Sequence, residues 1–345
     1  MIIRAGARAL LPALLDERHP GIRVVVIADD DAVAALGSPL PAVPLFTFPS
    51  GEAHKSRQTW ADLTDRLLAA RYDRHTVIVA FGGGVACDLA GFVASTFLRG
   101  VPWIAVPTTT LAMLDAAIGG KTGVDTPAGK NLVGTFHPPS AVLCDPSALR
   151  TLPDRHYREG LAEAVKHAAT LDASFGKWIL AHARHIAARE PRTLETLIRR
   201  SVEIKADVVM ADERETDRRA VLNAGHTVAH ALESATDYAI PHGEAVAIGL
   251  VLETRVAERM EVAQPGTADE ITAVLTRLGL PIAPPADLDR GRIMSVIDAD
   301  KKNRAGVVHA ALIASFGNMA RDGDAWTHAL DLNVLQRLLE ANGER

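Results

Sequence analysis

The sequence predicts an α/β protein of two parts: a parallel-sheet domain in residues 1–151 and a mainly α-helical domain in residues 152–345. The first part alternates short β-rich runs with amphipathic helical segments. Short apolar runs separated by helices are typical of parallel strands that are buried on both faces. The second part has helical spacing almost throughout, interrupted by Pro, Gly and polar clusters.

The elements expected in the first part follow from these runs. Strands are expected at residues 23–28, 43–48, 76–81, 103–106 and 141–144, with helices at 60–71 and 85–98. An open parallel sheet binds its ligands at the carboxyl ends of the strands, so the loops that follow these strands are the candidate ligand loops.

The second part begins near Leu152, and a linker is predicted at Thr151-Leu152-Pro153. Its apolar residues recur at helical spacing, and the stretches between them carry helix-breaking residues. Helices are expected at residues 161–180, 194–211, 220–235, 243–260 and 268–278.

Composition limits the classes of function. The 345 residues suit two domains of ordinary size, and 48% hydrophobic residues supply ample material for a core. A formal net charge of −5 argues against nucleic acid or an acidic membrane as the partner, so a bound anion must be held by a local group of Lys and Arg. With no signal-like or membrane-spanning stretch, we expect a cytoplasmic protein. Cys87 and Cys144 lie in apolar contexts, which favours buried thiols over a disulfide.

A glycine-rich turn, Gly82-Gly83-Gly84, lies between the strand at 76–81 and the helix at 85–98. Glycines let backbone amides approach a phosphate, and a helix N-terminus favours negative charge. The alternative is a tight turn without a ligand. Polar residues such as Asp29, Glu52 and Thr108 follow other strands, and several such loops on one sheet edge suit a dinucleotide better than a single phosphate.

Three segments carry side chains that could bind a metal: residues 160–167, 223–230 and 241–244. His226 and His230 are four residues apart and lie on one helical face, so spacing alone favours them as a ligand pair. Two His and a carboxylate make a catalytic zinc site with open coordination positions. The alternative is a set of surface or capping histidines.

Basic and amide residues gather near these segments. The segment Gly119-Gly120-Lys121-Thr122 lacks the first glycine of a phosphate-binding P-loop, because position 115 is Asp. A nucleotide hydrolase is therefore excluded, and the prediction is a site for a small polyanion. The basic and amide residues predicted to form this anion site are Arg99, Lys121, Lys130, Asn131, Lys166, Lys205, Arg219, Lys301 and Lys302.

Long motifs spread over residues 23–315 resemble the dehydroquinate synthases, the shikimate-pathway members of the sugar phosphate cyclases. They include GGGVACDLAGF, FLRG, GLAEAVKH, LNAGHTVAHALE, HGEAVAIG and DADKK, in this order. The resemblance implies an N-terminal Rossmann-like domain, a helical C-terminal domain and a homodimer. It also implies the cofactors NAD and a divalent metal, zinc or cobalt. The implied substrate is the phosphorylated seven-carbon sugar acid DAHP. The implied reaction is transient oxidation by NAD, phosphate elimination, re-reduction and aldol closure to 3-dehydroquinate.

The resemblance also implies a role for each matching residue. The metal ligands would be Glu163, His226 and His242, which leaves His230 free to handle a proton. NAD would be bound by Asp29, Glu52, Lys55, Gly83, Gly84, Asp88, Thr108, Thr109, Lys121 and Lys130. The substrate would be surrounded by Asp115, Lys121, Asn131, Lys166, Lys205, Arg219, Asn223 and Lys301, with Arg99 offered to the neighbouring subunit's phosphate site.

Some positions depart from the family pattern without removing a charged or metal-binding group. They are Cys87, Ala116, Ala117, Gly123, Asp125, Ala224, Val228 and Ala229. The alternatives to a dehydroquinate synthase are another sugar phosphate cyclase, a metal-dependent polyol or alcohol dehydrogenase, and a non-enzymatic NAD-binding scaffold. A dehydrogenase would not need the cations expected around a phosphate, and a scaffold would not depend on metal.

Overall fold

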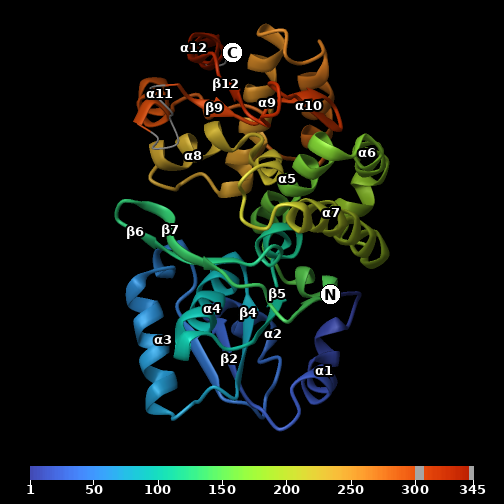
Figure 1. The fold of residues 1–345 in the computed structure, drawn as a ribbon. Helices are drawn as coiled ribbons and strands as arrows, with labels where there is room; N and C mark the ends of the chain where they lie inside the picture. Colours follow the sequence, from blue (N-terminus) through green and yellow to red (C-terminus); the bar gives the residue numbers. More distant parts are fainter. Residues whose placement is uncertain (300–306, 342–345) are drawn as a thin grey trace. The chain divides into compact units, whose positions relative to one another are not determined.

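The computed structural model describes residues 1–299 and 307–341 (Figure 1). These residues form two compact units. The first unit comprises Met1–Tyr157 together with Leu194–Val202, and the second comprises the rest of the described chain. Lys301 and Lys302, both expected near the phosphate, lie outside the described residues.

A six-stranded sheet organises the first unit, and every neighbouring pair of its strands is parallel. All five expected strands are present to within two residues, which confirms the predicted α/β class with a parallel sheet. An additional edge strand, β1, is too short to carry a periodic signal. The order across the sheet is β1 (Ile2–Ile3), β8 (Ala141–Cys144), β5 (Trp103–Pro107), β4 (Thr76–Gly82), β2 (Arg23–Asp29) and β3 (Leu45–Phe48).

The sheet is buried because its central strands are apolar on both faces. Every residue of β4 is buried. On one face, side chains such as Val79 and Phe81 join a core with Leu11 and Leu14 of helix α1 (Leu11–Arg18). Helix α2 (Asp30–Leu36) contributes Ala32 to the same core. The remaining helices of this half are α3 (Arg57–Ala69) and α4 (Gly84–Thr96).

The segment that carries Lys121, Lys130 and Asn131 is a β-hairpin, which the sequence patterns did not predict. Strands β6 (Lys121–Thr126) and β7 (Gly129–Phe136) pair antiparallel, with Gly123 opposite Gly134. Its glycines, threonines and lysines do not alternate with apolar residues, so the usual strand signal is missing. The hairpin brings three predicted ligand-binding residues onto one small element.

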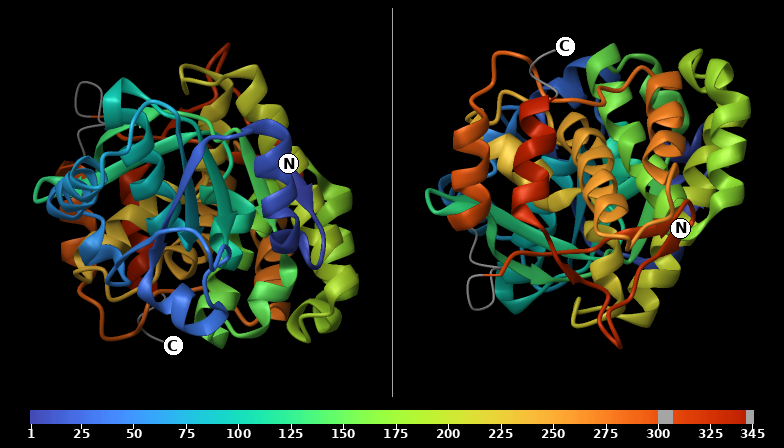
Figure 2. Two further views of the ribbon diagram at one scale, coloured as in Figure 1. Left: turned by 90° about the horizontal axis from the view of Figure 1, so that it is seen from below. Right: turned by 90° about the horizontal axis from the view of Figure 1, so that it is seen from above.

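The C-terminal half is mainly α-helical, as predicted (Figure 2). Two short antiparallel strand pairs, β9 (His309–Ala310) with β12 (His328–Ala329) and β10 (Ile313–Ser315) with β11 (Asn318–Met319), accompany the helices. The helices are α5 (Asp154–Leu171), α6 (Ala173–Ala187), α7 (Pro191–Ala211), α8 (His226–Ala235), α9 (His242–Arg259), α10 (Thr267–Arg277), α11 (Arg290–Ala299) and α12 (Leu332–Ala341).

Two of the helices predicted from the sequence are shorter in the structure than predicted. The prediction of one helix at 161–180 is wrong, because Asp172 is extended and its carboxylate accepts the N–H of Phe175, so a second helix starts there. The prediction of one helix at 220–235 is also wrong for residues 220–225. Residues Arg218–Asn223 form a 3-10 turn, and α8 begins after the left-handed Gly225.

No helix in the part of the chain that the structure describes combines the length and the apolar character needed to cross a membrane.

Helices α8 and α9 approach closely at two glycines. A Cβ at Gly249 would lie 2.0 Å from the carbonyl oxygen of Gly225, and a Cβ at Gly225 would lie 2.8 Å from the amide nitrogen of Leu250. Any larger residue at this crossing must therefore push the two helices apart. The crossing matters for the site because each helix begins with a histidine.

We therefore expect Gly249→Ala to lower the free energy of unfolding by about 1–3 kcal/mol, the usual range for overpacking a core. Urea unfolding followed by far-UV circular dichroism measures the change. Gly291→Ala is the control, because Gly291 is exposed in α11 and its added Cβ meets a flexible Asp289 side chain at 3.3 Å. Equal stability of the two variants would contradict the close approach of α8 and α9.

Candidate active site

Glu163 is a carboxylate in the interior of the second unit. It lies on α5, its exposed fraction is 0%, and neither carboxylate oxygen accepts a hydrogen bond from the described residues. Lys166, one turn further along α5, forms an ion pair with it. Burying a charge is unfavourable unless cations or hydrogen bonds surround it, so such a carboxylate is a natural ligand for a positive ion.

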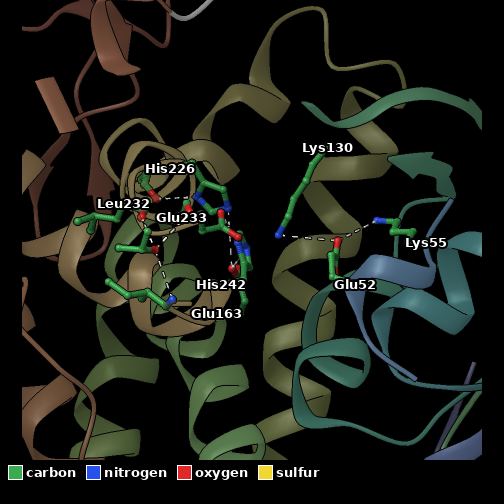
Figure 3. Close-up of polar contacts among 11 residues, drawn as sticks. Glu52, Lys55, Lys130, Glu163, His226, Leu232, Glu233 and His242 are labelled. Atoms are coloured by element: carbon green, nitrogen blue, oxygen red, sulfur yellow. Dashed lines mark hydrogen bonds and ion pairs between the residues drawn. The ribbon is translucent and has the colours of Figure 1, made fainter. Parts of the chain in front are cut away.

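Two imidazoles face the same carboxylate. The Nε2 atom of His242 lies 3.6 Å from Oε1 of Glu163, and the Nε2 atom of His226 lies 3.9 Å from it (Figure 3). One ligand atom from each of the three residues lies within 4.8 Å of the others. Two imidazole nitrogens and a carboxylate oxygen are the donor set of catalytic zinc sites, so these residues fit a divalent metal.

Local structure explains how two distant histidines reach one point. His226 is the first residue of α8, directly after Gly225, whose φ of 79° turns the chain into the helix. His242 is the first residue of α9, directly after the extended Pro241. Each imidazole therefore projects from the first residue of a helix, where the chain changes direction.

The charge states of His226 and Glu163 suit metal binding. Burial lowers the pKa of His226 well below its ordinary value of 6.5, and the positive charge of Lys166 lowers it further. Burial would raise the pKa of Glu163, but Lys166 and the two imidazoles outweigh burial and hold that pKa well below 4.5. A neutral imidazole and an ionised carboxylate are the forms in which these side chains bind metals.

Glu233 supports His242 from the other side of the ring. It is 3% exposed, and its Oε2 lies 3.3 Å from Nδ1 of His242. Burial would lower the pKa of His242, but interactions with Glu163 and Glu233 raise it to about 10. A carboxylate that holds Nδ1 leaves Nε2 directed at the metal position. The sequence reasoning missed Glu233, although it lies seven residues after His226 and so on the same face of α8.

His230 lies beside this cluster rather than within it. Its ring centroid is 5.4 Å from that of His226 and 6.4 Å from that of His242. The structure thus groups Glu163 with His226 and His242, whereas local spacing alone favoured His226 with His230.

The second unit also contains buried cations. Lys166 is 2% exposed, Lys205 is 6% exposed and Arg219 is 2% exposed. Arg219 donates a hydrogen bond from Nη1 to the carbonyl oxygen of Glu213 at 2.6 Å. Asn223 donates from Nδ2 to Oε1 of Glu215 at 2.7 Å, and sequence reasoning had not singled out Glu215. Buried guanidinium and ammonium groups are strong donors to phosphate oxygens.

The loop that carries Arg219 is organised by Asp212, another residue that sequence reasoning missed. Its carboxylate accepts the backbone N–H groups of Thr216 at 2.9 Å, Asp217 at 2.8 Å and Arg219 at 2.9 Å. Burial opposes ionisation, but these hydrogen bonds prevail and lower the pKa of Asp212 from 3.8 to about 2.

In the first unit, two of the residues predicted to bind a dinucleotide, Asp29 and Gly83, lie together at the carboxyl ends of β2 and β4. The Gly83 N–H donates to Oδ2 of Asp29 at 3.2 Å, and Oδ1 of Asp29 accepts the N–H of Ala32 at the start of α2. Gly82 has a φ of 153°, and a Cβ there would lie 2.0 Å from Oδ2 of Asp29. The glycine turn therefore lets the Asp29 carboxylate approach the start of α4.

A second polar group of the first unit surrounds Lys55. Its Nζ lies 2.6 Å from Oδ2 of Asp88 and 2.5 Å from Oδ1 of Asn131. It also lies 4.0 Å from Oε1 of Glu52 (Figure 3). Lys130 lies 3.8 Å from the same Glu52 oxygen. Burial would lower the pKa of Lys55, but Asp88 and Glu52 raise it.

Asp125, which departs from the family pattern, holds the hairpin against this group. Its Oδ1 accepts the N–H of Asn131 at 2.9 Å, and its own N–H donates to the carbonyl oxygen of Lys55 at 2.7 Å. Burial raises the pKa of Asp125 to about 6. Asn131 has a left-handed φ of 55°, so Asp125 helps to fix an uncommon backbone conformation at a predicted substrate residue.

The remaining predicted residues of the first unit lie on turns. Thr109 lies against Gly83, since a Cβ on that glycine would be 3.1 Å from the threonine methyl group. Thr108 is buried after β5, and its N–H donates to the carbonyl oxygen of Gly82 at 2.8 Å. Asp115 lies in a π-helical turn, Ala112–Ala116, a feature frequent at functional sites. Gly84 begins α4, Lys121 begins β6, and Arg99 is exposed at the end of a 3-10 turn, Phe97–Arg99.

Solved structures of two synthases share this fold. One is 2-deoxy-scyllo-inosose synthase complexed with carbaglucose-6-phosphate, NAD+ and Co2+, with a TM-score of 0.90 and 25% identity over 99% of this chain and 96% of that one. The other is ValA, 2-epi-5-epi-valiolone synthase from Streptomyces hygroscopicus subsp. jinggangensis with NAD+ and Zn2+ bound, with a TM-score of 0.87 and 28% identity over 100% and 96%. The fold is thus that of a class of synthases, and these two structures of the class contain NAD+ and a divalent metal.

Sequence matches identify the family within this class. Residues 45–159 match the 3-dehydroquinate synthase N-terminal model, and residues 160–303 match the 3-dehydroquinate synthase C-terminal model. The 3-dehydroquinate synthase of Halorhodospira halophila is 42% identical over 334 residues, 95% of this chain and 94% of that protein. The chain belongs to the 3-dehydroquinate synthase family. These matches do not favour the polyol or alcohol dehydrogenase alternative.

The hydrogen bonds to Asp212 predict how stability depends on pH. Because its pKa is about 2 in the folded protein and 3.8 ordinarily, the carboxylate stabilises the fold above pH 3.8 and loses this effect as pH falls toward 2. Asp212→Asn should therefore lower the free energy of unfolding most near neutral pH, and the difference from wild type should shrink as the solution is acidified. Urea unfolding at stepped pH measures it.

Asp65→Asn, which changes an exposed carboxylate of α3, serves as the control and should show little difference at any pH. A deficit for Asp212→Asn that is the same at pH 7 and pH 3 would contradict the role of the ionised carboxylate.

Proposed function

We propose that this chain converts DAHP to 3-dehydroquinate and inorganic phosphate. The observation that carries the proposal is the convergence of Glu163, His226 and His242, together with the buried cations Lys166 and Arg219 of the same unit. Membership of the 3-dehydroquinate synthase family supports it.

The three converging residues would hold a divalent metal, zinc or cobalt, and the glycine turn with Asp29 would hold NAD. When bound, the metal supplies Lewis-acid polarisation of a substrate hydroxyl, and NAD accepts a hydride and returns it. The synthases of this fold that contain NAD+ with Co2+ or Zn2+ support both assignments.

The cofactor residues of the first unit would act through backbone and carboxylate groups. Gly83 and Gly84 would present amides at the start of α4, where the helix dipole favours the pyrophosphate. Asp29, at the carboxyl end of β2, would accept hydrogen bonds from a ribose. Glu52, Lys55, Asp88, Thr108, Thr109, Lys121 and Lys130 complete the proposed cofactor site.

The substrate residues would bind negative charge and move protons. Arg219, Lys205 and Lys166 would stabilise the phosphate as its bond to carbon breaks, because cations placed in advance lower the barrier to charge development. His230, beside the proposed metal ligands, would carry a proton between substrate and solvent. Asp115, Asn131 and Asn223 would orient the substrate hydroxyls.

The proposal extends to a homodimer in the cytoplasm, with the exposed Arg99 contributing to the neighbouring subunit's phosphate site. Sedimentation velocity tests the dimer directly.

We expect the purified protein to release phosphate from DAHP only with a divalent metal and a catalytic amount of NAD. A chelator should abolish the activity, and added zinc or cobalt should restore it. His242→Ala should lower kcat at least 100-fold, because one of three protein ligands to the metal is lost. Phosphate release is measured by a coupled colorimetric assay, with circular dichroism to verify folding.

His185→Ala is the matched control, since His185 is an exposed histidine of α6 in the same unit, and its activity should equal that of wild type. Stoichiometric accumulation of NADH would contradict the cyclase proposal and indicate a dehydrogenase. Full activity after metal removal would contradict the assignment of the metal ligands.

A further inference from the structure

Helix α9 carries a buried glutamate that the proposed reaction does not use. Glu253 is 2% exposed and lies in the interior of the second unit. It follows His242 by eleven residues on the same helix, about three helical turns. Burial of a carboxylate at this depth requires strong hydrogen-bond donors around it.

Two hydrogen-bond donors to this carboxylate belong to the backbone at the start of α8. Oε2 of Glu253 accepts the N–H of Gly225 at 2.8 Å, and Oε1 accepts the N–H of Val228 at 2.9 Å. His226 lies between these two residues and is the first residue of the helix. One carboxylate thus holds the backbone on both sides of a proposed metal ligand.

This arrangement replaces a cap that α8 cannot supply for itself. Helices usually begin after Ser, Thr, Asp or Asn, whose side chain accepts an N–H of the first turn. Here the residue before the helix is Gly225, which has no side chain, and the close crossing of α9 excludes one. Glu253 accepts the two amide protons that a capping box would satisfy, but it does so from the neighbouring helix.

We propose that Glu253 is a positioning residue for the metal centre, which fixes the first turn of α8 so that the His226 imidazole is directed at Glu163 and His242. This inference rests on the proposed function, because it assumes that these three residues bind a metal. Glu253 acts through the backbone of α8 and does not itself bind the ion.

The same helix offers a matched comparison. Oε1 of Glu258 accepts the N–H of Ala268 in the first turn of α10 at 3.0 Å, so this glutamate also caps a neighbouring helix. Helix α10 carries none of the proposed ligands. Loss of either cap should destabilise the fold, but only loss of the Glu253 cap should change metal binding.

The experiment compares Glu253→Gln with Glu258→Gln. Glutamine keeps the shape of the side chain but places an NH2 group where one backbone N–H donor needs an acceptor. We expect Glu253→Gln to bind Co2+ about 10–100-fold more weakly than wild type, the range seen when groups that orient metal ligands are changed. The visible absorption spectrum of its cobalt form should also differ, because the imidazole is displaced. Glu258→Gln should match wild type in both.

Cobalt affinity is measured by competition with a chelating dye, and urea unfolding of the metal-free variants reports stability. An affinity and spectrum for Glu253→Gln equal to those of wild type would overturn the inference, even if stability falls. Should Glu253→Gln not fold, Glu253→Asp takes its place; it keeps the charge but reaches less far, and it should also weaken cobalt binding.

The outcome for His242→Ala separates this inference from the proposed function. If His242→Ala binds cobalt as tightly as wild type, the proposed metal centre is wrong and the inference falls with it. If His242→Ala loses cobalt and Glu253→Gln does not, the metal centre stands and only the role of Glu253 is rejected.

Discussion

The second unit is organised around the buried carboxylate of Glu163. A charge with an exposed fraction of 0% is stable only where the fold brings positive or proton-donating groups to it. Lys166 comes from the same helix, but His226 and His242 come from the starts of two others, so α5, α8 and α9 must converge. Two further carboxylates, Glu233 and Glu253, are buried on α8 and α9. Such a concentration of buried negative charge is consistent with a site for a divalent cation.

In the first unit, the parallel sheet gathers the carboxyl ends of its strands at one edge. Asp29 has two roles there, since one oxygen starts α2 and the other accepts the amide of Gly83. Lys55 joins Asp88 to Asn131 and thereby links helix α4 to the β6–β7 hairpin. Residues expected to bind a dinucleotide are thus held by hydrogen bonds to one another, which limits the side-chain freedom that binding would remove.

Sequence patterns predicted the strands and most helices because burial on both faces and helical spacing are local signals. They did not predict the helix break at Asp172, where one capping carboxylate outweighs continuous apolar spacing. They favoured His230 as a metal ligand because an i, i+4 pair is visible locally, whereas the approach of Glu163 to His242 depends on the fold. The matching family motifs indicated those two residues. The contact between Glu253 and residues 225–228 has no local signal at all, because the two segments belong to different helices.

The close crossing of α8 and α9 links the glycines at 225 and 249, the Glu253 cap and the positions of the two histidines. Close approach of the two helices requires glycine at 225 and 249, and glycine at 225 removes the side chain that would cap α8. The carboxylate that replaces this cap comes from α9, the helix whose first residue is His242. A single rigid helix therefore presents one imidazole and fixes the backbone that presents the other. Any displacement of α9 relative to α8 would move both imidazoles, so packing of the helix pair and geometry of the site cannot vary independently.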